Sequence, residues 1–156
     1  MPTSGIETYL QDHLAGSVAA VELVERAIAE NEGNQLAVVL GGVLADIRED
    51  QDVLRGLLAG LDAGESPLKK AGAWLAEKAG RLKLGDTGEP AIQRLEMLEA
   101  LSLGILGKLA LWRALQRVAD RHPALAGVDL ARLELRAREQ HERIEAHRLE
   151  AAVEAL

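Results

Sequence analysis

The chain has no cysteine and no phenylalanine, and one tyrosine and two tryptophans are its only aromatic residues. The absence of cysteine excludes disulfides, thiolate metal sites and thiol catalysis. The scarcity of aromatic side chains leaves little on which RNA bases could stack. Apolar residues nevertheless make up 48% of the chain, chiefly leucine, alanine, valine and isoleucine. This composition favours helices over sheets, which are enriched in β-branched and aromatic residues.

The chain also lacks a clustered positive charge and a long apolar stretch. Its net charge is −7 and its basic residues are scattered, which argues against nucleic acid or an anionic membrane as a partner. The longest apolar stretch, 100–107, is interrupted by Ser102 and ends before Lys108, so it is too short to span a membrane. The first basic residue is Arg26, and no secretory signal is expected. We therefore expect a cytoplasmic protein without nucleic-acid or membrane partners.

Helical periodicity dominates what is present, and the length suits a single domain over residues 1–156. Ser4 and Glu7 have the spacing of a capping box, in which each side chain satisfies a free backbone N–H group. The segment 31–34 contains a glycine between two asparagines and supplies a stop, a turn and the next cap. The pattern predicts long helices over about 5–31, 35–61, 90–121 and 129–155, and a short helix over about 67–79.

The loop lengths predict how these helices pack. The short loops make the first and second long helices antiparallel neighbours, and likewise the third and fourth. The long connection 62–89 allows the third helix to run in the same direction as the second. We therefore predict an all-α fold, an antiparallel four-helix bundle with an up-down-down-up order and a short crossover helix.

Two charged residues interrupt otherwise apolar helix faces. Asp50 stands in a repeat of leucine, isoleucine and valine over 36–61, where a carboxylate is costly unless it is paired. Lys108 lies in the apolar segment 103–112 with no acidic residue three or four positions away. Its ammonium must therefore snorkel outward or find its counter-charge on another helix. Counting from the two turns predicts a polar core layer at mid-height that contains His13, Asp46, Asp50 and Lys108, with His141, Glu142 and Glu145 at similar heights.

With this helix order and this layer, the chain resembles the ferritin-like superfamily, and within it a bacterial branch whose di-iron motif is not intact. The resemblance implies a site of carboxylates and Glu-x-x-His motifs on facing helices. Here Arg138 stands three residues before His141, and Ile144 stands three residues before His147. If iron or another divalent metal binds, the candidate ligands are His13, Asp50, His141, Glu142 and Glu145.

Three interpretations of the layer follow. The favoured one is a buried ion-pair network that fixes helix register, with Lys108 standing where a metal's charge would lie in an active relative. The second is a metal site, and the third is a small-molecule pocket. Gly16, Gly104 and Gly107 lie inside helices near this height, and we expect close helix–helix contact to explain them.

The functional expectation is a non-catalytic structural or interaction protein with no catalytic residues and no cofactor. The alternative is a metal-dependent oxidoreductase or metal-storage protein.

The helix over 90–121 is apolar around most of its circumference between Leu95 and Leu115, and the crossover is rich in leucine. The interior of one bundle cannot bury all of this apolar surface. We therefore predict a homodimer that forms through a helix face.

Overall fold

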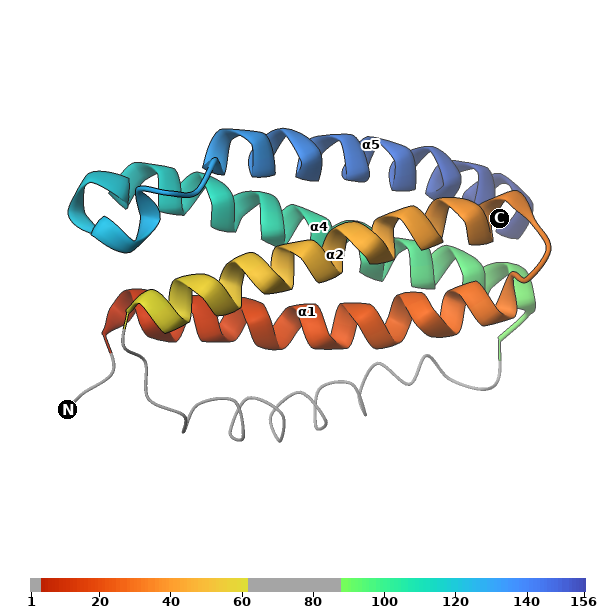
Figure 1. Cartoon of the computed structure of the whole chain (residues 1–156). Coiled ribbons are helices and arrows are strands. Elements are labelled where there is room, and N and C mark those ends of the chain that lie inside the picture. Colours follow the sequence, from red (N-terminus) through yellow and green to blue (C-terminus); the bar gives the residue numbers. More distant parts are fainter. Residues whose placement is uncertain (1–3, 62–87) are drawn as a thin grey trace.

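A computed structural model describes residues 4–61 and 88–156 of the chain (Figure 1). The described residues form four α-helices that pack against one another, which confirms the predicted all-α four-helix bundle. The predicted short helix over 67–79, with Trp74, lies outside the described residues. The elements in chain order are α1 (Gly5–Glu30), α2 (Gln35–Gly60), α4 (Pro90–Val118), the 3-10 turns η1 (Ala119–Arg121) and η2 (Pro123–Leu125), and α5 (Leu130–Ala155).

The helix ends follow from local side-chain chemistry. The Ser4 hydroxyl accepts a hydrogen bond from the Glu7 backbone N–H, and the Glu7 carboxylate accepts one from the Ser4 backbone N–H at 3.0 Å. The Asn34 Oδ1 atom caps α2 by accepting a hydrogen bond from the Ala37 backbone N–H at 3.2 Å. Gly33 has a φ of 85°, a left-handed conformation that glycine adopts without strain. These local features explain why the first turn and its flanking helix ends were predictable from sequence.

The helices follow the up-down-down-up order (Figure 1). In this view α1 runs from left to right, α2 and α4 run from right to left, and α5 returns from left to right. The pairs in contact are α1 with α2, α4 with α5, α1 with α4, and α2 with α5, and in each of them the two helices are antiparallel. Helices α2 and α4 are parallel and lie diagonally across the bundle, so a contact between them must cross the core.

The apolar core consists of two clusters, one toward each end of the bundle. The Trp112 cluster lies where α1 and α5 begin and where α2 and α4 end. The Leu98 cluster lies near the turn between α1 and α2. Each buries side chains from all four helices. The buried members of the Trp112 cluster are Leu10, Leu14, Leu54, Leu57, Leu58, Leu109, Leu111, Trp112, Leu115, Leu125, Leu130, Leu133 and Ala137. Those of the Leu98 cluster are Val24, Ala27, Leu36, Leu40, Val43, Ile47, Leu95, Met97, Leu98, Leu101, Ile105, Ile144 and Ala151.

The glycines inside the helices correct one expectation. A Cβ atom added at Gly16, Gly104 or Gly107 would meet nothing within 4 Å. Close contact among the four described helices therefore does not explain these glycines, and for these helices that prediction was wrong.

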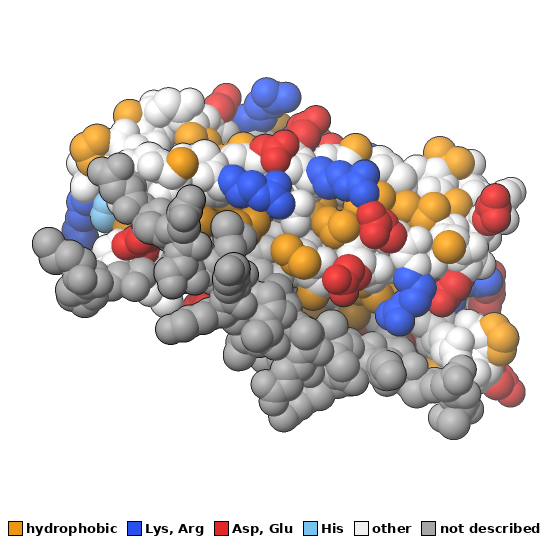
Figure 2. Space-filling model, turned by 60° about the horizontal axis from the view of Figure 1, so that its bottom comes forward, with side chains coloured by type: hydrophobic (Ala, Val, Ile, Leu, Met, Phe, Trp, Pro, Cys, Tyr) orange, Lys and Arg blue, Asp and Glu red, His pale blue; other side chains and the backbone are white. Residues whose placement is uncertain are grey.

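The outer surface carries mixed charge. Figure 2 shows acidic and basic side chains interspersed over one face of the molecule, with hydrophobic side chains between them. In the part of the chain that the structure describes, no helix is both long and apolar enough to cross a membrane.

Candidate functional site

A polar layer separates the two apolar clusters. Every helix that passes between the clusters carries polar side chains at this height, and several of these are almost wholly buried. Asp50 is 3% exposed, and the Gln140 side chain, on α5, is fully buried. We define the polar layer as Ser17, Asp46, Asp50, Gln51, Lys108, Arg136 and Gln140.

Asp50 is the centre of the layer because it binds two cations from two different helices. Its Oδ2 atom accepts a hydrogen bond from the Lys108 Nζ atom at 2.7 Å. Its Oδ1 atom accepts one from the Arg136 Nη2 atom. Asp50 lies on α2, Lys108 on α4 and Arg136 on α5, so the carboxylate ties three helices together. The Lys108 contact crosses the diagonal of the bundle.

Gln140 extends the network from Lys108 to the edge of the bundle. Its Oε1 atom accepts a hydrogen bond from the Lys108 Nζ atom. Its Nε2 atom donates to the Asp46 Oδ2 atom at 2.8 Å. Arg143 then approaches the same carboxylate oxygen at 3.5 Å from the half-exposed side. A buried amide with both ends bonded is fully used, which removes the cost of burying it.

Charges of opposite sign alternate along this network. Glu49 joins it at one end, where its carboxylate accepts a hydrogen bond from the Arg136 Nη1 atom. The order is then Glu49, Arg136, Asp50, Lys108, the neutral Gln140, Asp46 and Arg143. Three carboxylates balance three cations along the network, and the polar layer itself contains two of each, so neither carries a net charge. A buried charge is tolerated under this condition.

The two central cations respond differently to their surroundings. Burial lowers the pKa of the Lys108 ammonium, and the neighbouring Asp50 carboxylate opposes this without cancelling it. Burial also acts to lower the pKa of Arg136, but the hydrogen bond and charge of Asp50 outweigh it and raise that pKa. The two side chains are similarly exposed, 14% for Lys108 and 17% for Arg136. The pKa shifts differ because Arg136 is hydrogen-bonded to two carboxylates, Asp50 and Glu49, whereas Lys108 is bonded to one and is also repelled by Arg136.

A second branch connects α1 to the layer. Gln51 is 6% exposed, and its Nε2 atom donates to the Ser17 Oγ atom at 3.0 Å. Ser17 in turn donates to the backbone carbonyl of Leu14 in its own helix. Within the layer the contact between α1 and α2 is therefore neutral, and the charges of the layer are confined to α2, α4 and α5. The ion pair between Glu25 of α1 and Arg48 of α2, at 2.6 Å, lies outside the layer and is exposed.

The other predicted site residues lie outside this network. His13 is half-buried, and its ring packs edge-on against Tyr9 with the ring centroids 4.6 Å apart. Burial lowers the pKa of His13, and the charge of Asp12 opposes this shift. Glu142 is exposed, and His141 is half-buried. The structure therefore brings together Asp46, Asp50 and Lys108 from the predicted layer, and it places His13 outside the network, packed against Tyr9.

Glu145 belongs to a separate contact between α4 and α5. Its carboxylate accepts two hydrogen bonds from Arg148, with the Nε atom of Arg148 at 2.8 Å from Oε2. Ser102 approaches the same oxygen at 3.4 Å. The pKa of Glu145 is lowered, chiefly by the hydrogen bond from Arg148. This carboxylate is engaged by its own helix and does not face Asp50.

The residues of the layer do not fit a di-iron centre. Within residues 4–61 and 88–156, no three histidine, aspartate or glutamate side chains are grouped so that they could hold a metal ion. Both oxygens of Asp50 are bound by cationic side chains, and an ammonium at hydrogen-bond distance would repel a divalent ion. The chain also lacks the Glu-x-x-His motifs that such a centre uses. No reaction step through a metal follows from this arrangement.

Sequence reasoning missed four members of the layer, Ser17, Gln51, Arg136 and Gln140, and the two on α5 show why. Gln140 interrupts an apolar repeat on α5 in the same way that Asp50 interrupts one on α2, with Leu133, Ala137, Ile144 and Ala151 as the apolar members. The helical periodicity of the α5 sequence could therefore have identified Gln140 as a buried polar residue. Arg136 gave no such signal, because it lies beside the buried stripe and reaches Asp50 only through its long side chain.

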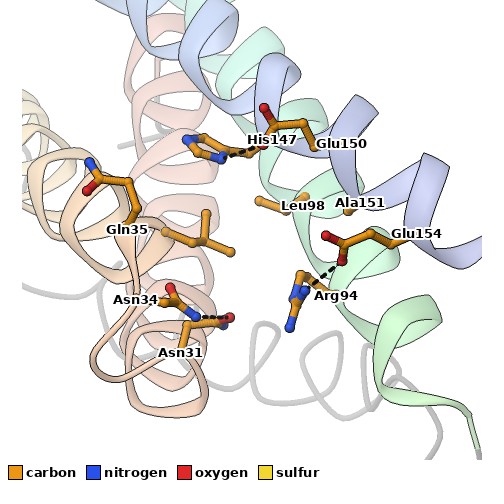
Figure 3. Close-up of a pocket in the computed structure, with 10 residues that line it drawn as sticks. Asn31, Asn34, Gln35, Arg94, Leu98, His147, Glu150, Ala151 and Glu154 are labelled. Carbon is orange, nitrogen blue, oxygen red and sulfur yellow. Dashed lines mark hydrogen bonds and ion pairs between the residues drawn. The ribbon is translucent and has the colours of Figure 1, made fainter.

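A cavity of about 380 Å³ lies at the opposite end of the bundle from Trp112, near the turn between α1 and α2 (Figure 3). Leu36, Leu98 and Ala151 are among its apolar lining residues. Polar side chains of the rim already contact one another: Arg94 of α4 pairs with Glu154 of α5 at 2.9 Å, and the His147 Nδ1 atom lies 3.5 Å from the Glu150 carboxylate on the same helix. These pairs satisfy the groups that a charged ligand would need.

Comparison of the chain with protein-family models, with curated proteins and with solved structures found no match. The resemblance to the ferritin-like superfamily therefore stays a prediction, and the function must be argued from the polar layer itself.

Proposed function

We propose that this chain is a non-catalytic helical bundle that acts in the cytoplasm as a structural or interaction module. In this proposal the polar layer holds the four helices in a single register. The proposal includes the ferritin-like resemblance, with protein charges standing where that superfamily places its metal ions.

The position of Lys108 carries this proposal. The positive charge at the centre of the bundle is a lysine ammonium, and its counter-charge Asp50 lies on the diagonal helix at 2.7 Å. A shift of α2 against α4 by one helical turn, about 5.4 Å, would break this contact and strand both charges in the core. Leucines in the adjacent clusters can exchange neighbours at a smaller cost. Charged pairs of this kind select one register from several that apolar packing alone would allow.

The test removes the diagonal pair while keeping its volume, in the double variant Asp50→Leu/Lys108→Met. Because removing both members of a buried pair strands neither of their charges, we expect only a small loss in the free energy of unfolding, which arises from the hydrogen bonds that Arg136 and Gln140 also lose. We also expect loss of a single packed state, measured as broadened NMR side-chain signals and increased dye binding to exposed apolar surface. A double variant with sharp signals and no dye binding would show that the layer does not select register.

The matched control is Asp52→Leu/Arg55→Met, which makes the same substitutions in an ion pair on the exposed face of the same helix. This control should leave the NMR signals sharp. The metal content of the purified protein and an absorbance test with Fe(II) in air address catalysis separately. Stoichiometric metal that is lost in Asp50→Ala would overturn the proposed function in favour of a metal-dependent oxidoreductase or storage protein.

A further inference from the structure

The outer face of α4 carries large apolar side chains that are exposed to solvent. Its residues repeat at spacings of four and three, which places them on one side of the helix. Leu103 is 65% exposed and Leu106 is 42% exposed, although both are large and apolar. We define the α4 outer face as Glu99, Leu103, Leu106, Gly107, Ala110, Arg113 and Arg117.

Charge is distributed along this face in a polarised way. Glu96 and Glu99 lie on the side of its apolar centre where α4 begins, and Arg113 and Arg117 lie on the side where it ends. All four side chains are exposed. Only apolar and small residues lie between these acidic and basic ends of the face.

This pattern is complementary to itself. If two copies of the face meet antiparallel about a two-fold axis between Leu106 and Ala110, Glu99 of one copy lies level with Arg117 of the other. Leu106 then packs against Ala110 of the second copy. It also lies close to Leu106 of that copy. An isologous interface requires this correspondence, because each surface element must meet its own complement after a two-fold rotation. A parallel pairing would instead place like charges together at both ends.

The glycine on this face adds an independent observation. Among the residues that the structure describes, a Cβ atom at Gly107 would meet nothing within 4 Å, and a glycine in a helix interior costs about 1 kcal/mol relative to alanine. The absence of a side chain at this position lets a second helix approach the backbone closely. Gly107 and Ala110 would thus accommodate the Leu106 side chain of a partner helix.

The exposed apolar residues of α5 form no comparable face. Leu135 is 55% exposed and Leu149 is 53% exposed, but Arg138, Glu139 and Glu142 are exposed between them. Charged residues at the middle of a face must be desolvated when it is covered, which disfavours association. Helix α4 therefore offers the better docking surface of the two.

We propose that the occupant of the α4 outer face is a second copy of this chain, and that the protein forms a two-fold symmetric dimer in which the two α4 helices pack antiparallel. This inference rests on the proposed function, since it names the partner of an interaction module. A pairing centred on one helix is a small interface, so a micromolar dissociation constant is expected.

The first experiment measures the mass of the full chain by sedimentation equilibrium at concentrations above and below the micromolar range. Wild-type protein should be dimeric at the high end. Leu106→Glu should be monomeric, because it places two carboxylates near the two-fold axis. Leu135→Glu makes the same change at a similarly exposed leucine on α5 and should remain dimeric. A monomeric wild type, or a dimer that survives Leu106→Glu, would overturn the proposal.

A charge exchange tests the antiparallel orientation. Glu99→Arg should weaken the dimer by at least about tenfold, because it opposes two arginines. The double variant Glu99→Arg/Arg117→Glu restores opposite charges across the axis and should recover dimerisation. Failure of the double variant to recover would overturn the antiparallel pairing.

These measurements separate the two proposals. A monomer whose polar layer selects register refutes only the dimer. Stoichiometric metal in a dimer that Leu106→Glu breaks refutes only the non-catalytic function.

Discussion

The two apolar clusters and the polar layer share one core, yet different rules hold them together. In the clusters, leucine and other aliphatic side chains contact several neighbours each, and stability comes from the apolar area that they remove from water. In the layer, Asp50, Lys108 and Gln140 each bind particular atoms on other helices. The layer therefore restricts the arrangement of helices, while the clusters provide most of the free energy of folding.

The comparison also explains why the layer lies at mid-height. A charged pair near a bundle end can reach water by a small movement, as Arg94 and Glu154 do on the surface. At mid-height, apolar clusters lie on both sides of the charged pair. A charge that loses its partner there cannot reach water by a small movement and stays buried. The penalty for a wrong register is thus greatest where this chain places its charges.

The largest expected effect lies in the Trp112 cluster. Trp112 is fully buried, and Trp112→Ala should lower the free energy of unfolding by about 3 to 5 kcal/mol through lost burial and a cavity. Denaturant titration measures this loss. Leu149→Ala, at a half-exposed position, should change stability by less than about 0.5 kcal/mol. If Trp112→Ala lowers the free energy of unfolding no more than Leu149→Ala does, the apolar clusters do not provide most of the stability.

A smaller effect is expected in the layer from Asp50→Asn. The substitution keeps the shape but removes the charge that Lys108 and Arg136 share, and we expect a loss of about 2 to 3 kcal/mol. Adding Lys108→Met should recover part of this loss, because it removes the stranded ammonium. If the double variant is less stable than Asp50→Asn alone, the two residues are not coupled in the way described.

The smallest effect concerns a polar cluster at the edge of the bundle. Hydrogen bonds from Gln116, Arg113 and Arg138 lower the pKa of Glu134 from 4.5 to about 2. Because the folded-state pKa is depressed, the stabilisation is present above pH 4.5 and is lost as the pH falls through about 2. The difference in unfolding midpoint between wild type and Glu134→Gln should therefore shrink over this range.

The control for this titration is Glu139→Gln, at an exposed position on the same helix. Its difference from wild type should stay nearly constant over the same pH range. A constant difference for Glu134→Gln as well would show that the edge cluster does not stabilise the fold in a pH-dependent way.

Much of the fold was predictable because the relevant signals are local. The capping box at Ser4, the turn around Gly33 and the apolar repeats of α2 and α5 lie within single segments of chain. The loop lengths then favoured the order of helix directions. The level of Lys108 was also estimated correctly to within one turn, since its partner on α5 is Gln140, while the count predicted Glu142.

The rest of the site was not predictable for a physical reason. Which of two neighbouring side chains faces the core depends on the rotation of each helix about its axis, and one residue changes this by about 100°. Counting residues along the chain gives the height of a side chain along the bundle axis, but it does not give the rotation of its helix. His13 and Glu142 were therefore placed in the layer by height alone, whereas Arg136 enters it through the reach of its side chain.

The sequence by itself determined the four long helices, most of their ends and the presence of two charges that could not be satisfied within their own helices. The helix predicted over 90–121 ends as an α-helix at Val118 and continues as a 3-10 turn to Arg121. Only the tertiary structure decided that Asp50 and Lys108 meet across the diagonal, that Arg136 and Gln140 complete the network, and that Gly107 faces outward. Helix formation depends on neighbours three and four residues away, which the sequence displays directly. The pairing of buried charges depends on how four helices are rotated and packed together, and a single helical segment does not contain this information.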